Sequence, residues 1–393
     1  MDDRPVVVTD ENTTVVLPAP LAPGDHEAIA QVGPELLRVV SAGERSILEV
    51  GPVCGVLELE GCRLQVEPKL LVDGVTTAVW IAYAGSVPVH VERSRGWSVG
   101  VPGLRDVVVE ALLHECSRLV ANGLLRDYRG EEAVDTVLRG RLDVARQIGR
   151  RYGQVDRLHI HRVDRRIDIS ENLICGAALD VASSVSIGER RRRIRDIRDA
   201  FPPATRGDAL ARLRRLHYHS LNARYRSALR WAGLLLGDGG VDDMVVPGRW
   251  RAGSLLINMN RLWERGVARA CADASTKLGA SAPHHRSITV AETGRSTRSF
   301  IPDAVLQGPE PRPVDAKYKQ YVDRAISSGD VHQLLTYGTA YESVAILVHP
   351  ALEPAPPRRV DVRSDGRLLG AIAVVPVDVT RPPEEAAGLL ALV

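Results

Sequence analysis

The sequence predicts a multidomain α+β protein in which a small β domain comes first, a helical region follows, and an α/β domain with a mixed sheet comes last. Short apolar runs separated by Gly and Pro fill residues 1–75, and helical periodicity dominates residues 76–250. Strand-like and helix-like segments then alternate over residues 251–393. A chain of 393 residues is long enough for two or three domains, each with its own core.

The β domain is predicted from short runs rich in Val and Leu, which end at Gly, Pro or charged residues as the strands of a barrel or a sandwich do. These runs cover residues 6–9, 14–17, 36–40, 53–59 and 63–67. A packed scaffold, a partner-binding module and a nucleic-acid-binding module would all show this pattern. The sequence therefore predicts the fold of this domain and leaves its role open.

The middle region is predicted to be mainly helical. Apolar residues recur with helical spacing in residues 106–125, 171–185 and 209–236, and the last of these is predicted as one long helix. Residues 131–148 are predicted to form a strand–turn–helix connection. The arginine-rich run at residues 189–198 suits either a solvated helix or a surface for DNA phosphates or an acidic partner.

Composition excludes several classes of protein. A hydrophobic content of 45% with 25% charged residues is ordinary, and no apolar run approaches the roughly 18 to 20 residues that span a membrane. The five cysteines are scattered without Cys-x-x-Cys spacing, which argues against a zinc site or a disulfide framework. No phosphate-binding loop motif and no secretory pattern are visible. We therefore expect a cytoplasmic protein that does not enter a membrane.

Lysine is rare in this chain, and its distribution draws attention to one segment. Only four of the 51 basic residues are lysines, and two of them lie within residues 315–319. Residues 299–306 and 312–318 are predicted as the two strands of a hairpin, joined by a turn that contains Gly and Pro. Strand residues two apart share a face, so Asp315 and Lys317 are expected to point the same way.

The same hairpin can bring Asp303 beside this pair, which completes a constellation suited to phosphodiester hydrolysis. Two carboxylates and a backbone carbonyl provide oxygen ligands of the kind that Mg²⁺ prefers. A neighbouring ammonium group orients or helps to deprotonate the attacking water and offsets phosphate charge. An isolated Asp-x-Lys on a strand is usually only a solvated face, but here Asp303, Asp315 and Lys317 occur in the order that a nuclease requires.

Two predicted helices contribute further candidates. Residues 258–271 carry Glu264, which would reach the metal site from the helix that precedes the hairpin. Residues 330–341 carry Gln333 and Tyr337, which lie four positions apart and therefore share one helix face. Two hydrogen-bonding groups stacked in this way suit a phosphate or a metal-bound water.

These segments resemble the PD-(D/E)xK nuclease superfamily, and more closely its McrC branch, the nuclease subunit of McrBC-type modification-dependent restriction systems. The resemblance covers the chain from about residue 70 to the end, and its most specific motifs lie in the last third. Those motifs are Asn-Arg-Leu-Trp-Glu at 260–264, Ile-Pro-Asp at 301–303, Val-Asp-Ala-Lys-Tyr-Lys at 314–319 and His-Gln-Leu-Leu-Thr-Tyr at 332–337, and softer ones lie at 138–143 and 167–175.

The resemblance implies that residues 251–393 form a PD-(D/E)xK nuclease domain. Asp303, Asp315 and Glu264 would bind Mg²⁺ or Mn²⁺, and Lys317 would position or activate the attacking water. Gln333 and Tyr337 of the following helix would keep the site in register. The activity implied is that of a DNA endonuclease.

The resemblance also implies partners. A McrB-like AAA+ GTPase would recognise and translocate double-stranded DNA carrying modified cytosine, and the regions before residue 251 would dock on it and stimulate its GTP hydrolysis. The net charge of only +2 agrees with a second subunit that supplies much of the DNA binding. Two alternatives remain, a stand-alone repair or recombination nuclease and an inactive activator of the GTPase. The intact Asp303, Asp315 and Lys317 argue against the inactive activator.

Overall fold

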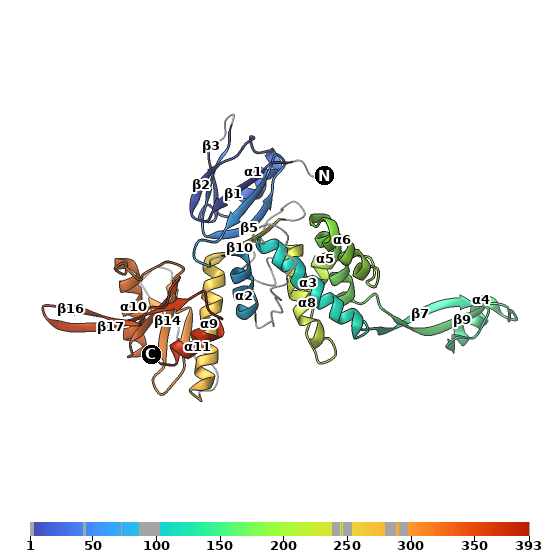
Figure 1. The fold of residues 1–393 in the computed structure, drawn as a ribbon. Coiled ribbons are helices and arrows are strands. Elements are labelled where there is room, and N and C mark those ends of the chain that lie inside the picture. The colour runs from blue at the N-terminus through green and yellow to red at the C-terminus, as the bar shows by residue number, and fades with distance from the viewer. Residues whose placement is uncertain are drawn as a thin grey trace. The chain divides into compact units, whose positions relative to one another are not determined.

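The computed structural model describes residues 4–41, 45–71, 73–85, 103–237, 244, 246, 254–279, 288–290 and 298–392. The chain forms two units, one made of residues 1–111 and 237–393 and the other of residues 112–236 (Figure 1). The first unit is therefore discontinuous in sequence and combines segments expected in the first and third domains. The boundary after residue 111 falls within helix α3 (Leu104–Ala121).

Two small sheets that share one core form the amino-terminal part of the first unit. Their strands are β1 (Val6–Asp10), β2 (Thr13–Val16), β3 (Leu37–Ser41), β4 (Ile47–Val50), β5 (Val53–Glu58), β6 (Arg63–Glu67) and β10 (Leu255–Asn258). One sheet has the order β1-β6-β5-β10 and the other β2-β4-β3. Leu48 of one sheet and Leu57 and Leu64 of the other lie in the common core. The sequence predicts all of these strands except β4 and β10, and it does not predict helix α1 (Pro23–Ala30).

A glycine allows β10 to join this sheet. β10 pairs antiparallel with β5, and Gly55 lies opposite Leu256. A Cβ atom at Gly55 would lie 2.0 Å from the Leu255 carbonyl oxygen, and the φ angle of Gly55 is +129°, which favours glycine. The close approach of the two strands therefore requires a residue without a side chain at this position.

Two helices connect the β domain with the carboxyl-terminal sheet. Helix α2 (Gly74–Ala84) packs on helix α9 (Met259–Lys277). The Trp80 and Trp263 rings meet at 5.0 Å between centroids, and Gly266 leaves room for Trp80. Both tryptophans are buried, so the segment that follows β10 is part of the interior of the first unit.

The carboxyl-terminal sheet is mixed, as the sequence predicts. Its strands are β13 (Ala304–Leu306), β14 (Arg312–Ala316), β15 (Ala345–Ala351), β16 (Arg358–Ser364) and β17 (Arg367–Asp378), in the order β13-β14-β15-β17-β16. The three central strands are parallel and the two edge strands are antiparallel to their neighbours. Helix α10 (Ser328–Tyr341) buries Leu334 and Tyr337 against Leu347 of β15, and helix α11 (Glu384–Leu390) packs on α9.

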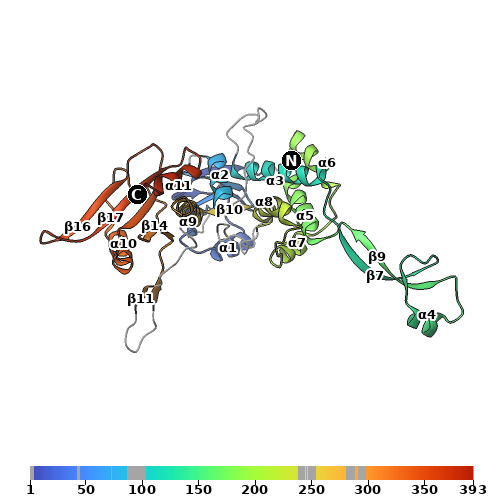
Figure 2. The same ribbon diagram turned by 90° about the horizontal axis from the view of Figure 1, so that it is seen from below.

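Helix α5 (Ser170–Val185) is the centre of the second unit, since it contacts α6 (Gly188–Arg198), α7 (Arg206–Leu213) and α8 (Arg226–Leu236). A ribbon of strands β7 (Asp127–Asp135) and β9 (Leu158–Arg166) extends from these helices, as Figures 1 and 2 show. It ends in the short strand β8 (Arg141–Leu142) and helix α4 (Val144–Arg151). We call residues 127–166 the arm. Among the described helices, none is long and apolar enough to cross a membrane.

The prediction of one long helix over residues 209–236 is wrong. The helical segments α7 and α8 are separated, and Asn222 lies between them with 1% exposure. The Asn222 side chain accepts a hydrogen bond from the His219 N–H and donates to the His217 carbonyl and to Glu171. By binding the backbone of residues 217–219, the Asn222 side chain competes with helical hydrogen bonds and holds the segment between α7 and α8 in a non-helical conformation.

Candidate functional site

Asp303 follows a break in the hairpin strand expected at residues 299–306. The structure divides this segment between β12 (Arg298–Phe300) and β13, so the prediction of one continuous strand is wrong. The Asp303 Oδ2 accepts a 2.8 Å hydrogen bond from the Ala316 N–H at the end of β14. Desolvation raises the pKa of Asp303, and the Ala316 hydrogen bond opposes this rise. The break thus turns the Asp303 carboxylate toward the Asp-x-Lys strand.

The buried Asp315 forms an ion pair with the half-buried Lys317 at the end of β14. The Lys317 Nζ lies 2.8 Å from the Asp315 Oδ2, and Asp315 is only 1% exposed. Burial raises the pKa of Asp315, and the Lys317 ammonium opposes this rise. Burial alone would lower the pKa of Lys317, but the nearby carboxylates, Asp315 above all, raise it above its usual value. Lys317 is therefore a charged ammonium at neutral pH.

Helix α10 supports Lys317 through a chain of hydrogen bonds. The Lys317 Nζ donates to the Gln333 Oε1 at 3.2 Å, and the Gln333 Nε2 donates to the Tyr337 hydroxyl at 3.0 Å. The Tyr337 hydroxyl in turn donates to the Ile301 carbonyl at 3.1 Å, two residues before Asp303. Gln333 and Tyr337 share a helix face as the sequence predicts, and they tie the segments just before β13 and just after β14 to one helix.

Helix α9 places Glu264 at the margin of this group. The Glu264 Oε2 accepts a 3.0 Å hydrogen bond from the Arg261 Nη1, one turn earlier on the same helix. The negative charge of Glu264 contributes to the raised pKa of Asp303, so the two carboxylates interact electrostatically. Asp303, Asp315, Lys317, Gln333 and Tyr337 are thus brought together by direct contacts, whereas Glu264 interacts with them at a distance.

Asp330 is a further acidic residue at this site that the sequence argument does not select. Its Oδ1 lies 4.0 Å from the Lys317 Nζ, and its Oδ2 accepts hydrogen bonds from the Ser327 and Tyr321 hydroxyls. Burial alone would raise the pKa of Asp330, but these two hydrogen bonds lower it below its usual value. The pattern Ser-x-x-Asp at the start of α10 indicates a helix cap. Because this local role explains the Asp by itself, the sequence gives no sign of its proximity to Lys317.

The carboxylates suit a divalent cation. Apart from the Lys317 ion pair, neither carboxylate oxygen of the buried Asp315 has a hydrogen-bond partner in the described structure. Within the described residues, no three His, Cys, Asp or Glu side chains are grouped as a metal site. A cation here would therefore draw on Asp303 and Asp315, and main-chain oxygen and water would complete its coordination.

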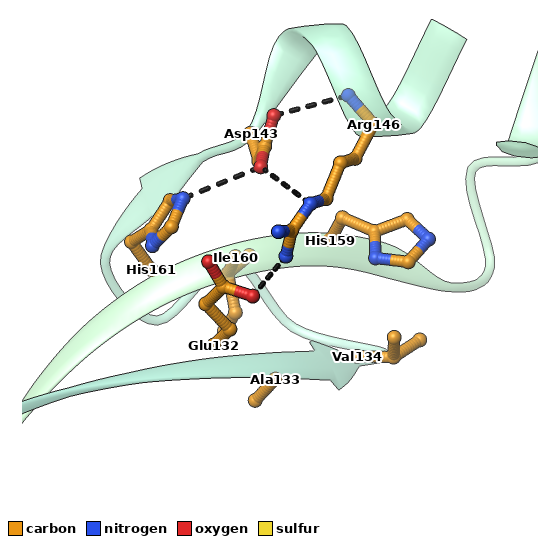
Figure 3. Close-up of a pocket in the computed structure, with 8 residues that line it drawn as sticks. All are labelled: Glu132, Ala133, Val134, Asp143, Arg146, His159, Ile160 and His161. Carbon is orange, nitrogen blue, oxygen red and sulfur yellow. Dashed lines mark hydrogen bonds and ion pairs between the residues drawn. The ribbon is translucent and has the colours of Figure 1, made fainter. Parts of the chain in front are cut away.

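A pocket in the second unit lies at the arm and contains none of the predicted site residues (Figure 3). The Asp143 Oδ2 lies 3.3 Å from the His161 Nε2 and 3.5 Å from the Arg146 Nε, and Arg146 also pairs with Glu132. Figure 3 shows these charged groups turned toward one another, with no such interaction at His159. The charges are thus largely satisfied internally, and they fix α4 against the strands of the arm.

Comparison with solved structures identifies the fold. A chain from the Thermococcus gammatolerans assembly described as a refined half-complex of McrB AAA+ hexamers with bound McrC matches with a TM-score of 0.68 at 16% identity. The match covers 98% of this chain and 99% of that chain. A chain of the T. gammatolerans McrBC complex solved by cryo-EM matches with a TM-score of 0.52 at 17% identity, over 68% of this chain and 88% of that one. The fold is therefore shared.

A family model defines the membership. A search of curated proteins gave no significant sequence match. The model described as the McrBC 5-methylcytosine restriction system component matches residues 48–350, which is more than half of the chain and includes the site residues from Glu264 to Tyr337. The chain therefore belongs to the family of McrBC 5-methylcytosine restriction system components.

Proposed function

We propose that this chain is the DNA endonuclease subunit of a McrBC-type restriction complex, with a PD-(D/E)xK site formed around Asp303, Asp315 and Lys317. The observation that carries the proposal is the ion pair of the buried Asp315 with the half-buried Lys317, beside a second carboxylate. Burying such a pair contributes little to stability, since desolvation offsets most of the attraction. A reaction that needs both charges at this point explains the pair better than folding does.

Asp303 and Asp315 would hold Mg²⁺ or Mn²⁺, and Glu264 would join the metal shell on release from Arg261. The bound cation would polarise the scissile phosphate and lower the pKa of a water molecule. Asp315 suits this role because its oxygens are buried and, apart from the Lys317 ion pair, have no hydrogen-bond partner among the described residues. Asp303 suits it because the Ala316 N–H fixes the direction of its carboxylate.

Lys317 would hold the attacking water and offset negative charge on the phosphate. As a charged donor, the Lys317 ammonium can hydrogen-bond a water molecule or a phosphate oxygen. The Gln333 side chain fixes the direction of the ammonium, and Tyr337 fixes Gln333. Asp330 adds a second carboxylate that keeps Lys317 charged.

The partner in this proposal is a McrB-like AAA+ GTPase that delivers double-stranded DNA carrying modified cytosine. The amino-terminal and middle regions would dock on it and stimulate its GTP hydrolysis. The arm supports a docking role because many large apolar side chains are exposed within this one segment, and exposed apolar side chains that are grouped mark an interaction site. They are Tyr128, Val134, Val137, Leu138, Val144, Ile148, Tyr152, Val155 and Val163.

The test is Mg²⁺-dependent cleavage of modified plasmid by this chain together with its GTPase and GTP. Asp315→Asn should abolish cleavage, because the variant loses the carboxylate that binds the cation. Asp361→Asn is the control, since Asp361 lies on the edge strand of the same sheet and pairs only with surface arginines. Unreduced cleavage by Asp315→Asn would refute the assignment, and cleavage without partner and GTP would instead indicate a stand-alone nuclease.

A further inference from the structure

Tyr318, the residue after Lys317, reaches the amino-terminal β domain. Its hydroxyl donates a 2.8 Å hydrogen bond to the Glu11 Oε1, although 307 positions separate the two residues in sequence. Both side chains are buried. This contact therefore lies in the interior of the first unit and joins the turn after β1 to the Asp-x-Lys segment.

The β domain holds Glu11 at a fixed point. The Glu11 N–H donates to the Glu67 carbonyl at 3.0 Å, and its Oε1 also accepts from the Lys69 N–H at 2.7 Å. The Oε2 is buried without a hydrogen-bond partner among the described residues, and burial raises the pKa of Glu11. Burying a carboxyl group costs stability, and the hydrogen bonds from the Lys69 N–H and the Tyr318 hydroxyl offset part of this cost.

Strand β15 and helix α9 hold the same segment from another direction. The Lys317 N–H donates to the Val348 carbonyl at 2.9 Å, and the Trp263 Nε1 donates to the same carbonyl at 3.2 Å. The Trp263 and Tyr318 rings lie 6.4 Å apart between centroids. The Lys317 side chain contacts α10, whereas the Tyr318 side chain contacts α9 and Glu11. The two neighbours thus anchor the turn after β14 on different sides.

We propose that Glu11 and Tyr318 are positioning residues that fix the Lys317 ammonium for the cleavage step. The inference rests on the proposed role of Lys317 in DNA cleavage. A lysine has a long flexible stem, so its backbone must be fixed for its ammonium to meet a water or phosphate in a reactive geometry. The β domain would then contribute to DNA cleavage through the buried Glu11–Tyr318 hydrogen bond, in addition to any docking role.

Tyr318→Phe removes the hydroxyl and keeps the ring against Trp263. We expect about a tenfold lower kcat for plasmid cleavage with an unchanged KM for DNA, because the variant misplaces Lys317 without touching the DNA surface. Tyr83→Phe is the matched control, since Tyr83 is also buried in the first unit and donates a 3.0 Å hydrogen bond to Asp273. Tyr83→Phe should retain wild-type kcat, and equal losses in both variants would overturn the inference.

Glu11→Gln tests the other end of the bond. Its amide oxygen can still accept from the Lys69 N–H and the Tyr318 hydroxyl, so the β domain should stay folded, but the negative charge that strengthens the bond to Tyr318 is lost. Because both residues act through one bond, the double variant should lose no more kcat than Tyr318→Phe alone. Fully additive losses would show that the two side chains act independently, which would contradict the proposal.

The placement of Lys317 can also be measured without cleavage. The chain has four lysines, so an NMR spectrum of protein with isotopically labelled dimethyl groups on its lysines should resolve Lys317. Its signal should shift in Tyr318→Phe and Glu11→Gln but not in Tyr83→Phe, with Lys277 as the internal reference. If the Lys317 signal shifts in these variants but the wild-type chain does not cut DNA, the positioning of Lys317 is supported and the proposed nuclease function is refuted. An unmoved Lys317 signal would overturn the inference whatever the activity.

Discussion

At the scale of single residues, Asp315 is subject to two opposing influences. Burial favours its neutral form and raises its pKa, whereas the Lys317 ammonium favours the carboxylate and lowers it. Because Asp315 is almost fully buried, water cannot replace the ammonium as a source of solvation. The negative charge of Asp315 is therefore supported by Lys317.

Lys317→Met should make the stability of the protein more dependent on pH. Without the ammonium, the pKa of Asp315 in the folded protein rises further, while its value in the unfolded chain stays near about 3.9. A carboxyl group whose pKa is raised on folding contributes stability below the unfolded pKa, and this contribution is lost as the pH rises through the folded pKa. We expect the melting temperature of Lys317→Met to fall relative to wild type as the pH rises above about 4.

The double variant Asp315→Asn/Lys317→Met separates the carboxylate from other effects of the substitution. It has no carboxyl group to desolvate at position 315, so its melting temperature should depend less on pH than that of Lys317→Met. The same fall in the single and the double variant would show that another group is responsible.

The sequence places some site residues well because their proximity follows from local rules. Asp315 and Lys317 are two apart on a strand, and Gln333 and Tyr337 are four apart on a helix. Their contacts with one another also follow once the hairpin and the next helix are placed in order. The bond between Tyr318 and the β domain does not follow, because a pairing across 307 positions leaves no periodic signal in the chain.

At the scale of elements, the arm is a β ribbon of low intrinsic stability that exposes apolar side chains. A two-stranded ribbon is only marginally stable by itself in water. The ion pairs of Asp143 and Arg146 hold α4 to the strands, yet large apolar side chains around them remain exposed. The sequence predicts a strand–turn–helix at residues 131–148, and β7 and α4 bear this out. It misses β9, whose pairing with β7 depends on residues beyond that window.

Tyr152→Ser combined with Val155→Ser should weaken binding to the GTPase partner and leave the fold of the chain unchanged. The two residues are 85% and 84% exposed, so the substitutions remove no core packing. We expect about a tenfold higher Kd, measured by titration calorimetry with the assembled GTPase. Leu369→Ser is the matched control, because Leu369 is exposed on β17 of the first unit. Wild-type affinity in the arm variant would show that the arm is not the docking surface.

At the scale of the whole molecule, the first unit is assembled from both ends of the chain. β10 enters the amino-terminal sheet after the whole second unit has intervened, and the Glu58 N–H donates to the Ser254 hydroxyl across 196 positions. The sequence assigns residues 251–258 to the nuclease domain because periodicity is a local signal and strand pairing is not. Fold class and element types are therefore predictable here, whereas the association of distant segments is not.

If the first unit is one folding entity, residues 1–111 and 237–393 should assemble when they are expressed as two separate chains. Gly55→Ala should prevent this assembly, because the added Cβ would lie 2.0 Å from the Leu255 carbonyl oxygen and would force β10 away from β5. Gly24→Ala is the control, since a Cβ there meets nothing within 4 Å. Co-purification of the two chains measures the outcome. If the two chains still assemble with Gly55→Ala, the β5–β10 pairing is not essential, and the Trp80–Trp263 contact between α2 and α9 would hold them together.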